Sequence, residues 1–393
     1  MKLGFVYIVK NEEQNLKKSL ESIKSIADEI VIVDTGSTDK TKEIAKQYTD
    51  KVYDYVWDDD FGKARNFSIE KSESDWLLWL DADEELKDIE LLKKWKEEGP
   101  KEGVKCYTLP LINYVADNPQ NMFWTIKLFS RELRFQRRIH EGLNVERSEQ
   151  IGRLPIVIYH WGYNKIDDES KRKRFDRNIG LLLKQKEVEG SSKSNTFHLG
   201  SSYYYIHDYE KAIPYFKELV DGITGTPVPF EIEAATYLTN AYYKLSRLDE
   251  AINAAKFLKS IEPCNVVAYY VKGMAMARKG KIQKGLEEVS EALEYLKTSP
   301  TKVSTYNYVD YSFANWACNM GFVYNLAGNY LKSLMCYKAA YMEEPDNEMV
   351  QLNVLKALYM LKEKKEFLSF YNKHKPKNIP KEILGEMLLE KGV

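Results

Sequence analysis

The sequence predicts an α/β domain built on a parallel sheet, followed by an all-α domain of helical repeats. Up to Leu80, short apolar runs alternate with amphipathic segments, which is the pattern of strands joined by crossover helices. From Ser194 onward the apolar period is helical, and small residues recur at a fixed separation. A chain of 393 residues is long enough for two such domains, each with its own core.

The elements of the α/β domain follow from apolar runs of strand length and from stretches of helical period. In chain order, strands are expected over 3–9, 29–34, 51–57 and 76–80, and helices over 13–26, 40–48, 61–71 and 84–98. The later elements are expected to be a strand over 105–115, a loop over 118–121, a hairpin of 124–129 with 133–136, and a strand over 154–158. A long helix over 167–186 follows.

The charge balance and the apolar content exclude several classes of protein. With 58 basic and 59 acidic residues, no overall field favours nucleic acid or an anionic membrane surface. The four cysteines are scattered without metal-ligand spacing, as expected of reduced thiols. The N-terminal apolar run is too short for a signal peptide, and no run approaches the roughly 20 apolar residues that cross a bilayer. We therefore expect a cytoplasmic protein without membrane insertion.

Acidic side chains follow the expected strands where each strand ends. Glu12 follows the first strand, Asp34 ends the second, an acidic run at 58–60 follows the third, and Asp81 and Asp83 follow the fourth. In a parallel sheet these ends share one edge, where such sheets bind ligands. Two carboxylates around a single Ala suit Mg²⁺ or Mn²⁺, whose shells are completed by waters and substrate phosphates. Each acid alone could simply cap a helix, but together they favour a nucleotide site.

Four motifs in this order resemble the family 2 glycosyltransferases that have the GT-A fold. The motifs are Val9-Lys-Asn-Glu12, Val33-Asp-Thr-Gly-Ser-Thr-Asp39, Ala64-Arg-Asn66 and Asp81-Ala-Asp83. The resemblance implies a Rossmann-like GT-A domain over residues 1–165 that binds a nucleotide-sugar and transfers the sugar. One position departs from the family pattern, because Lys10 stands where an aromatic residue often stacks on the base.

The resemblance also implies roles for individual residues at this edge of the sheet. The donor, a UDP-sugar, is expected to contact Val9, Asn11, Glu12, Asp34, Ser37, Arg65, Asp81 and Ala82. Within this set, Asp34 accepts a hydrogen bond from the base and Arg65 contacts the diphosphate. Asp81 and Asp83 form the DxD pair that binds ribose and the metal ion, Mg²⁺ or Mn²⁺, with His160 as a third metal contact. Trp161 and Tyr163 are expected either to face the acceptor and sugar or to cover the core.

An inverting transfer needs a base that removes the proton of the acceptor nucleophile. The resemblance places this role at the acidic position after the DxD pair, which is Glu141, with His140 as its orienter or substitute. The commoner pair in the family is Glu-Asp, so the choice between His140 and Glu141 stays open. The other interpretation of Glu141 is an ion pair with Arg137 or Arg138.

The second half of the chain resembles tetratricopeptide repeats, whose helix pairs stack because one pair cannot bury its apolar face alone. Pairs of small residues twelve positions apart mark the expected repeats: Gly200 and Ala212, Thr239 and Ala251, Gly273 and Gly285, Gly321 and Ser333. We expect the repeat domain over 193–393 and a linker helix over 166–192. The basic cluster Lys171–Arg174 in that helix is either a solvated face or a positive lip over the diphosphate.

These features together predict an inverting, metal-dependent glycosyltransferase with a peptide or protein acceptor. A repeat solenoid offers a longer concave surface than a small sugar acceptor requires. The architecture is similar to the glycocin S-glycosyltransferases, which modify bacteriocin precursors on Cys or Ser. The repeat domain is then expected to help bind the acceptor or to form a homodimer. Two alternatives stay open: a transferase of cell-surface polysaccharide or lipopolysaccharide synthesis, and a repeat scaffold without catalysis.

Overall fold

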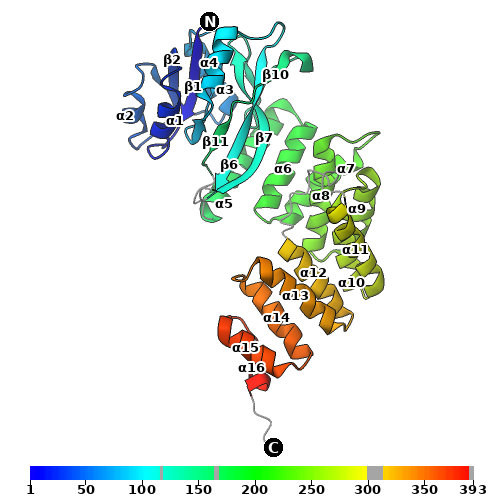
Figure 1. Ribbon diagram of the computed structural model, residues 1–393. Coiled ribbons are helices and arrows are strands. Elements are labelled where there is room, and N and C mark those ends of the chain that lie inside the picture. The colour runs from blue at the N-terminus through cyan, green and yellow to red at the C-terminus, as the bar shows by residue number, and fades with distance from the viewer. Residues whose placement is uncertain (116–117, 163–167, 299–312, 389–393) are drawn as a thin grey trace, which may run out of the picture. The chain divides into compact units, whose positions relative to one another are not determined.

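The chain folds into an α/β unit and an all-α unit (Figure 1). The computed structural model describes residues 1–115, 118–162, 168–298 and 313–388, and its two compact units are Met1–Ser191 and Ser192–Val393. This confirms the predicted fold class, an α/β domain followed by an all-α domain of helical repeats. None of the helices that the structure describes has both the length and the apolar character of a membrane span.

One half of the sheet in the first unit is parallel. β1 (Leu3–Val9) pairs in parallel with β2 (Glu29–Asp34) and β4 (Trp76–Trp79), and β2 pairs in parallel with β3 (Val52–Asp54). Strands β1, β2 and β4 therefore end at one edge, as the sequence predicts, and the acidic side chains that follow them come together there.

The other half of the sheet is mixed. From β4 outward, the order is β7 (Asn118–Ser130), β6 (Cys106–Val115), β11 (Ile158–His160) and β5 (Glu84–Leu86), with β10 (Ile151–Arg153) also paired to β6. β7 is antiparallel to both of its neighbours, and β5 is antiparallel to β11. A separate two-stranded ribbon consists of β8 (Phe135–Gln136) and β9 (Gly142–Leu143).

Helices cover both faces of the sheet. Leu3, Phe5 and Tyr7 of β1 pack with α1 (Leu16–Ile23) and α4 (Ile89–Glu98), whereas Val6 packs on the opposite face with Ile69 of the helix over 61–71. Because β1 is buried on both faces, it is a continuous apolar run without alternation. The remaining helices of this unit are α2 (Thr41–Ala45), α3 (Phe61–Lys71), a 3₁₀ turn at Ser148–Gln150, and α5 (Asp168–Glu189).

Several predicted elements differ from the structure in their extent. The first helix is shorter than predicted, and the strand predicted over 51–57 spans only Val52–Asp54. The helix predicted over 84–98 is wrong in its first part, because residues 84–86 form β5 and pair with β11. The strand predicted over 154–158 is also wrong, since pairing begins only at Ile158. Pro155 precedes it and has no N–H for a sheet ladder.

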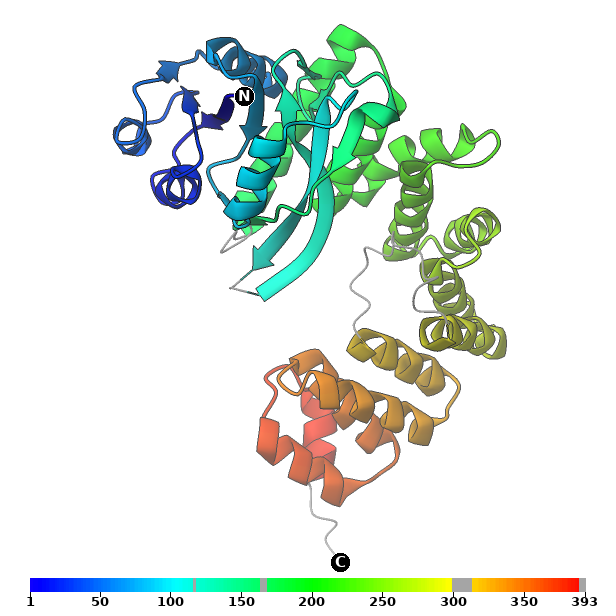
Figure 2. The ribbon, with the colours of Figure 1, turned by 45° about the horizontal axis from the view of Figure 1, so that its top comes forward.

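The predicted hairpin of 124–129 with 133–136 is wrong. β7 begins at Asn118, where a loop was predicted, and it forms a long hairpin with β6 (Figure 2), whereas Phe135 pairs with Leu143. The apolar pattern marks only the end of β7 that reaches the core, at Leu128 and Phe129. The rest of β7 is held by backbone hydrogen bonds to β6, which leave no apolar signature in the sequence.

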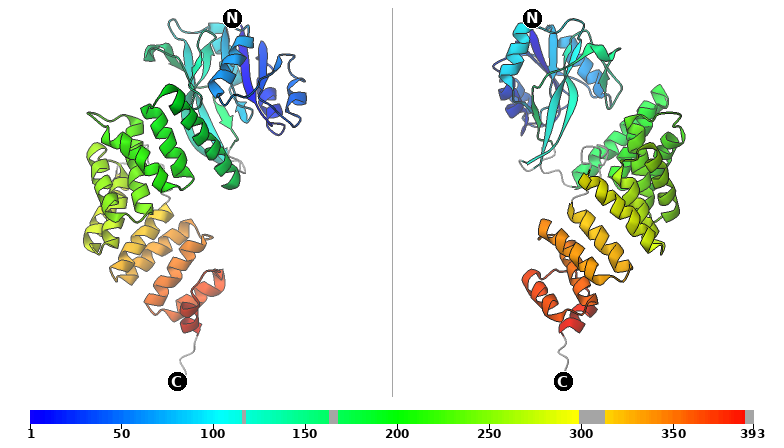
Figure 3. Two further views of the ribbon diagram at one scale, coloured as in Figure 1. Left: turned by 180° about the vertical axis from the view of Figure 1, so that it is seen from behind. Right: turned by 45° about the vertical axis from the view of Figure 1, so that its right-hand side comes forward.

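The second unit consists of successive antiparallel helix pairs (Figure 3). The helices are α6 (Lys193–Tyr205), α7 (Tyr209–Asp221), α8 (Pro229–Lys244), α9 (Leu248–Ile261), α10 (Val266–Arg278), α11 (Ile282–Thr298), α12 (Phe313–Leu326), α13 (Tyr330–Glu343), α14 (Glu348–Met360), α15 (Lys364–His374) and α16 (Lys381–Leu388). Small residues lie where paired helices touch: a Cβ on Gly200 would be 2.7 Å from the Phe216 ring, and one on Gly321 would be 2.5 Å from the Tyr337 ring. The recurring small residues therefore mark tetratricopeptide-like helix contacts, as predicted.

Candidate functional site

A pocket of about 440 Å³ lies at the edge where β1 and β4 end. Nine of the residues singled out in the sequence line it: Val9, Glu12, Arg65, Asp81, Ala82, Asp83, His140, Glu141 and His160. Asn11 and Ser37 belong to the loops after β1 and β2, Asp34 is the last residue of β2, and Trp161 lines a neighbouring pocket. Tyr163 lies outside the described residues. Motifs that are far apart in the sequence therefore meet in one cavity.

The loops after β1 and β2 are tied together at one end of this site. The backbone N–H of Asn11 donates to Ser37 Oγ at 2.9 Å, and Asn11 Oδ1 accepts from the backbone N–H of Thr38 at 2.8 Å. Asp34 is 2% exposed, and its Oδ2 accepts from the backbone N–H groups of Gly36 and Ser37. Its Oδ1 is buried and has no hydrogen-bond partner among the described residues. A buried acceptor without a partner is costly, so this oxygen is suited to a donor on a ligand.

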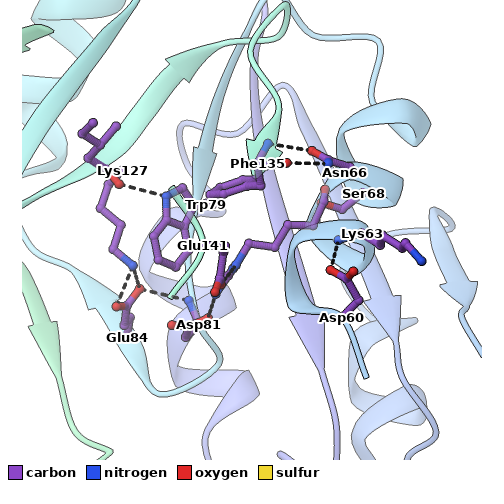
Figure 4. Close-up of polar contacts among 12 residues, drawn as sticks. Asp60, Lys63, Asn66, Ser68, Trp79, Asp81, Glu84, Lys127, Phe135 and Glu141 are labelled. Atoms are coloured by element: carbon purple, nitrogen blue, oxygen red, sulfur yellow. Dashed lines mark hydrogen bonds and ion pairs between the residues drawn. The ribbon is translucent and has the colours of Figure 1, made fainter. Parts of the chain in front are cut away.

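Arg65 joins Asp81 of the DxD pair to the candidate base Glu141. Figure 4 shows these two carboxylates close together. Its Nη2 donates to Asp81 Oδ1 at 3.0 Å, and its Nε donates to Glu141 Oε1 at 2.7 Å. The guanidinium lies 4.0 Å from the centre of the Trp79 ring, and the side chain is only 8% exposed. Burial alone would lower the pKa of Arg65, but the two carboxylates outweigh this and raise it, so the group stays charged. Glu141 thus pairs with Arg65 rather than forming the alternative pair with Arg137 or Arg138.

The segment that carries Glu141 is fastened to the helix that carries Arg65. Asn66 Nδ2 donates to the Phe135 carbonyl at 2.9 Å, and Asn66 Oδ1 accepts from the Phe135 backbone N–H at 2.8 Å. Asp60 caps the same helix, α3, by accepting from the backbone N–H of Lys63. Asn66, the residue next to Arg65 in the Ala64–Asn66 motif, therefore holds the segment of Glu141 close to Arg65.

A buried ion pair that the sequence analysis missed supports Asp81. Lys127 Nζ lies 2.7 Å from both carboxylate oxygens of Glu84, and the two side chains are 1% and 3% exposed. Glu84 Oε2 also accepts from the backbone N–H of Asp81 at 2.9 Å. Burial would raise the pKa of Asp81, but the charges of Arg65 and Lys127 outweigh it and hold this pKa below its ordinary value. The only sequence signal was a lysine inside an apolar strand, at the centre of Ile126–Leu128.

Of the three residues predicted to hold a divalent cation, Asp83 and His160 lie together, whereas Asp81 Oδ1 accepts a hydrogen bond from Arg65. Asp83 Oδ2 lies 3.3 Å from His160 Nε2, while His160 Nδ1 lies 2.7 Å from Asn113 Oδ1, an outer partner of the kind that orients metal-binding histidines. In the described ranges, no three His, Cys, Asp or Glu side chains gather into a complete metal site. Two protein ligands suffice for Mg²⁺ or Mn²⁺ when waters and phosphates supply the rest. The donor set therefore fits the predicted ion.

The pairing of Asp83 with His160 requires glycine at position 162. A Cβ at Gly162 would lie 2.2 Å from Asp83 Oδ2 and 2.6 Å from His160 Nε2, which is too close for either atom to stay in place. We expect Gly162→Ala to weaken Mn²⁺ binding by about 10–100-fold, although it removes no ligand atom. Calorimetric titration with Mn²⁺ checks this, and Gly180→Ala is the control because its Cβ meets nothing within 4 Å. Unchanged Mn²⁺ affinity would contradict this role of Gly162.

His140 lies beside Glu141 in a strained backbone conformation. Its φ of 50° falls in the left-handed region that most side chains avoid, and it lines the pocket. Desolvation by the pocket walls, with a further contribution from Arg137, holds the pKa of His140 below its ordinary value despite the Glu141 carboxylate. The ring is therefore neutral at pH 7 and chemically able to take up a proton.

Trp161 contributes to a neighbouring pocket of about 220 Å³ with Asn15, Lys18 and Asp83. Its ring lies 3.8 Å from Lys18 Nζ, and its Nε1 donates to Glu85 Oε2 at 3.2 Å. This position does not decide between the two expectations for Trp161, facing the acceptor and sugar or covering the core. The expected role of Trp161 stays a prediction.

Helix α5 adds positive charge to the main pocket. Arg174, Arg177 and Asn178 line it, whereas Arg172 and Lys173 are exposed and pair with acids one turn away on the same helix. Gln185 fixes the helix, since its Oε1 accepts from the backbone N–H of Arg138 at 3.0 Å. The basic cluster is thus partly a solvated face and partly a positive lip. Arg177, which lies one turn beyond the cluster, was not among the residues predicted for the site.

Comparison with known proteins finds a family model that matches most of the first unit. Residues 5–144 match the model of glycosyl transferase family 2. The chain is 29% identical to glycosyltransferase SunS of Bacillus phage SPbeta over 224 residues, which cover 54% of this chain and 52% of SunS. It is 33% identical to a TPR repeat-containing protein of Synechococcus elongatus over 172 residues, 40% of this chain and 41% of that protein. The chain thus spans about half the length, or less, of these curated relatives.

A solved structure is similar to part of the chain. A tetratricopeptide repeat protein from Parabacteroides merdae covers 56% of this chain, and 81% of that protein is matched. The sequence identity is 14% and the TM-score is 0.43.

Proposed function

We propose that this protein is an inverting glycosyltransferase that moves a sugar from a UDP-sugar to a Cys or Ser side chain of a polypeptide. The proposal starts from the match of residues 5–144 to glycosyl transferase family 2. The observation that carries the proposal is the Arg65 bridge between Asp81 and Glu141, because it brings a donor-binding residue and a candidate base into one pocket. The repeat domain supports a polypeptide acceptor, since stacked repeats present extended binding surfaces.

The donor would lie with its base at the β1 and β2 loops and its diphosphate beside Arg65. The buried Asp34 Oδ1 is an acceptor that suits the N3–H of uracil. Arg65, Arg174 and Arg177 provide fixed positive charge for the departing diphosphate. When bound, Mg²⁺ or Mn²⁺ held by Asp83 and His160 would neutralise further charge on the diphosphate.

In the proposed transfer, the acceptor sulfur or oxygen bonds to the anomeric carbon as the bond from that carbon to the diphosphate breaks. UDP leaves with the bonding electron pair, and the acceptor proton passes to the pair of His140 and Glu141. Glu141 Oε1 is already engaged by Arg65, so Glu141 is well held, while His140 is neutral beside it. Either residue can act as the base, and the two make different kinetic predictions.

The separate variants His140→Ala and Glu141→Gln distinguish the two bases. Loss of the base is expected to lower kcat by about 10²–10⁴-fold, with a smaller loss for a Cys acceptor because its thiolate is partly present near neutral pH. If His140 is the base, activity falls as the pH drops through its pKa, and this limb lies below about 6.5 because that pKa is lowered. The pH profile of kcat should then lose its acidic limb in His140→Ala. Equal, small losses in both variants would contradict the assignment to this pair.

The proposed activity is tested with the full chain, Mn²⁺ and a panel of UDP-sugars. The expected result is UDP release with one or a few sugars, a rise in melting temperature with the same sugars, and a mass increase of one sugar on Cys or Ser peptides. UDP release only with glycan acceptors would instead support polysaccharide synthesis. No release and no stabilisation with any nucleotide-sugar would overturn the proposal. Whether the protein forms a homodimer stays a prediction.

A further inference from the structure

One edge of β7 runs beyond the sheet without a neighbouring strand. β4 pairs with β7 only at Leu128, Phe129 and Ser130, whereas β6 pairs with β7 along its other edge as far as Asn118. In the part of the chain that the structure describes, β7 has no strand neighbours besides β4 and β6. The stretch Met122–Ile126 is therefore an open edge at the level where β4 has already ended.

The backbone groups on this edge can be assigned from a single contact. Trp79 Nε1, on the β4 side, donates to the carbonyl of Ile126 at 2.9 Å, so that carbonyl points away from β6. Backbone direction alternates along a strand, and the register with β6 is regular from Ile126 to Asn121. The N–H and C=O groups of Trp124 and Met122 therefore also face the open edge. Pro110, which has no N–H, lies opposite Trp124, in agreement with this assignment.

Between Met122 and Ile126, the open edge has no charged residue and no register shift, although Pro119 and one register shift on each side flank it. The sequence from Asn118 to Ile126 contains no charged residue, and its apolar side chains are exposed: Met122 is 56%, Phe123 is 44% and Trp124 is 37% exposed. Proteins usually block such edges with lysines, bulges or covering segments, because unpaired backbone groups recruit another strand. An edge with this composition is suited to a strand supplied by another polypeptide.

The Ile126 end of this edge is connected to the candidate active site through Trp79. Ile126 contacts Trp79, and the Trp79 ring lies against Arg65, which holds Asp81 and Glu141. We infer that an extended segment of the acceptor polypeptide adds to β7 at Met122–Ile126 as a further strand and so carries its nucleophile toward this pocket. The inference rests on the proposed function. A polypeptide fits because alternate N–H and C=O groups on an edge are matched by another backbone in extended form.

Two variants of one residue test the inference. Trp124→Pro removes the N–H that faces the open edge but none of the hydrogen bonds to β6, whereas Trp124→Val removes the same indole and keeps that N–H. The probe is a fluorescent peptide of alternating Thr and Val residues with one central Cys, and its binding to the full chain is measured by anisotropy without donor. We expect Trp124→Pro to bind this peptide about tenfold more weakly than Trp124→Val does.

Backbone methylation of the peptide provides a second test that needs no variant. A single N-methyl group should weaken binding at every second position and leave the positions between nearly unchanged, because only alternate N–H groups face β7. Equal affinity of the two Trp124 variants, or no alternation with the methylated peptides, would overturn the inference. So would a dimer of the chain that Trp124→Pro dissociates, since the edge would then belong to a second copy.

Failure of this inference can be told apart from failure of the proposed function. UDP release from a UDP-sugar in water, without any peptide, depends on the donor pocket and should be the same in wild type, Trp124→Pro and Trp124→Val. If UDP is released but the peptide tests fail, the transferase stands and the acceptor site is elsewhere. If no UDP-sugar is bound or cleaved, the proposed function fails, whatever the peptide result.

Discussion

Arg65→Met is expected to cause the largest loss of stability of any single substitution in the first unit that we consider. The variant leaves the carboxylates of Asp81 and Glu141 side by side without the cation that holds both. Breaking a buried ion pair by removing one partner costs about 3–5 kcal/mol, and we expect the lower end because the Asp81 side chain is 38% exposed. Urea unfolding of the first unit measures this loss of stability. The proposed UDP release should also fall by about 10²–10³-fold, since a positioned cation at the diphosphate is gone.

The pH dependence of stability gives an independent check of the Arg65 prediction. A carboxyl group with a lowered pKa, such as Asp81, contributes stability above its ordinary pKa and loses it as the pH falls through the lowered value. In Arg65→Met this contribution shrinks, so stability should change less with pH in the acidic range below about 4.

A double variant separates two causes of the stability loss in Arg65→Met: the missing ion-pair attraction, and the burial of a carboxylate that has lost its partner. Adding Glu141→Gln to Arg65→Met should recover part of the stability, because one of the two unpaired carboxylates is removed. Lys173→Met serves as the control, since its ion pair with Glu169 is exposed on both sides and such pairs contribute little. Additive losses in the double variant would show that Arg65 and Glu141 do not interact energetically.

Asp83→Asn is expected to abolish most of the proposed metal-dependent turnover while leaving the fold intact. The amide keeps the size of the side chain but loses the negative charge that suits Mg²⁺ or Mn²⁺. We expect UDP release to fall by about 10²–10³-fold and added Mn²⁺ to lose its stimulating effect. The pKa of His160, which Asp83 raises against the lowering effect of burial, should decrease in this variant.

A matched control for Asp83→Asn exists at another strand exit. Asp58→Asn makes the same chemical change after β3, where Asp58 pairs with Lys63 at the surface and does not line the pocket. Its UDP release should be close to that of the wild type. Undiminished, cation-independent release by Asp83→Asn would refute the interpretation of the DxD pair as a donor site.

The parallel half of the fold could be predicted because the burial of each strand is visible in the apolar character of its own residues. β1 and β4 are buried on both faces and are continuous apolar runs, and the polar residues that follow them mark the carboxyl edge. The small residues of the repeats were equally informative, because close helix crossings admit no larger side chain. In both cases a local pattern is the direct result of packing.

The parts that escaped prediction depend on partners far away in the sequence. In the sequence, Lys127 is an unexplained charge within an apolar strand, and only the structure shows that it pairs with Glu84. Arg177 likewise looks like a solvent-exposed charge, and only the structure shows that it lines the pocket. β7 was divided incorrectly because most of its pairing involves the backbone, which any residue supplies. Sequence patterns record burial, and they do not record which charged group lies opposite which.

The position of β5 has a consequence for the curvature of the sheet. Between β4 and β5 in the sheet order lie β7, β6 and β11, so a flat sheet would separate β4 from β5 by four strand spacings, about 19 Å. Yet only four residues, 80–83, connect Trp79 to Glu84, and a fully stretched chain covers about 17 Å over those five steps. The sheet must therefore curl toward a half-barrel, and the DxD segment crosses its mouth through a turn in which the Asp81 carbonyl accepts a hydrogen bond from the Glu84 backbone N–H at 3.0 Å.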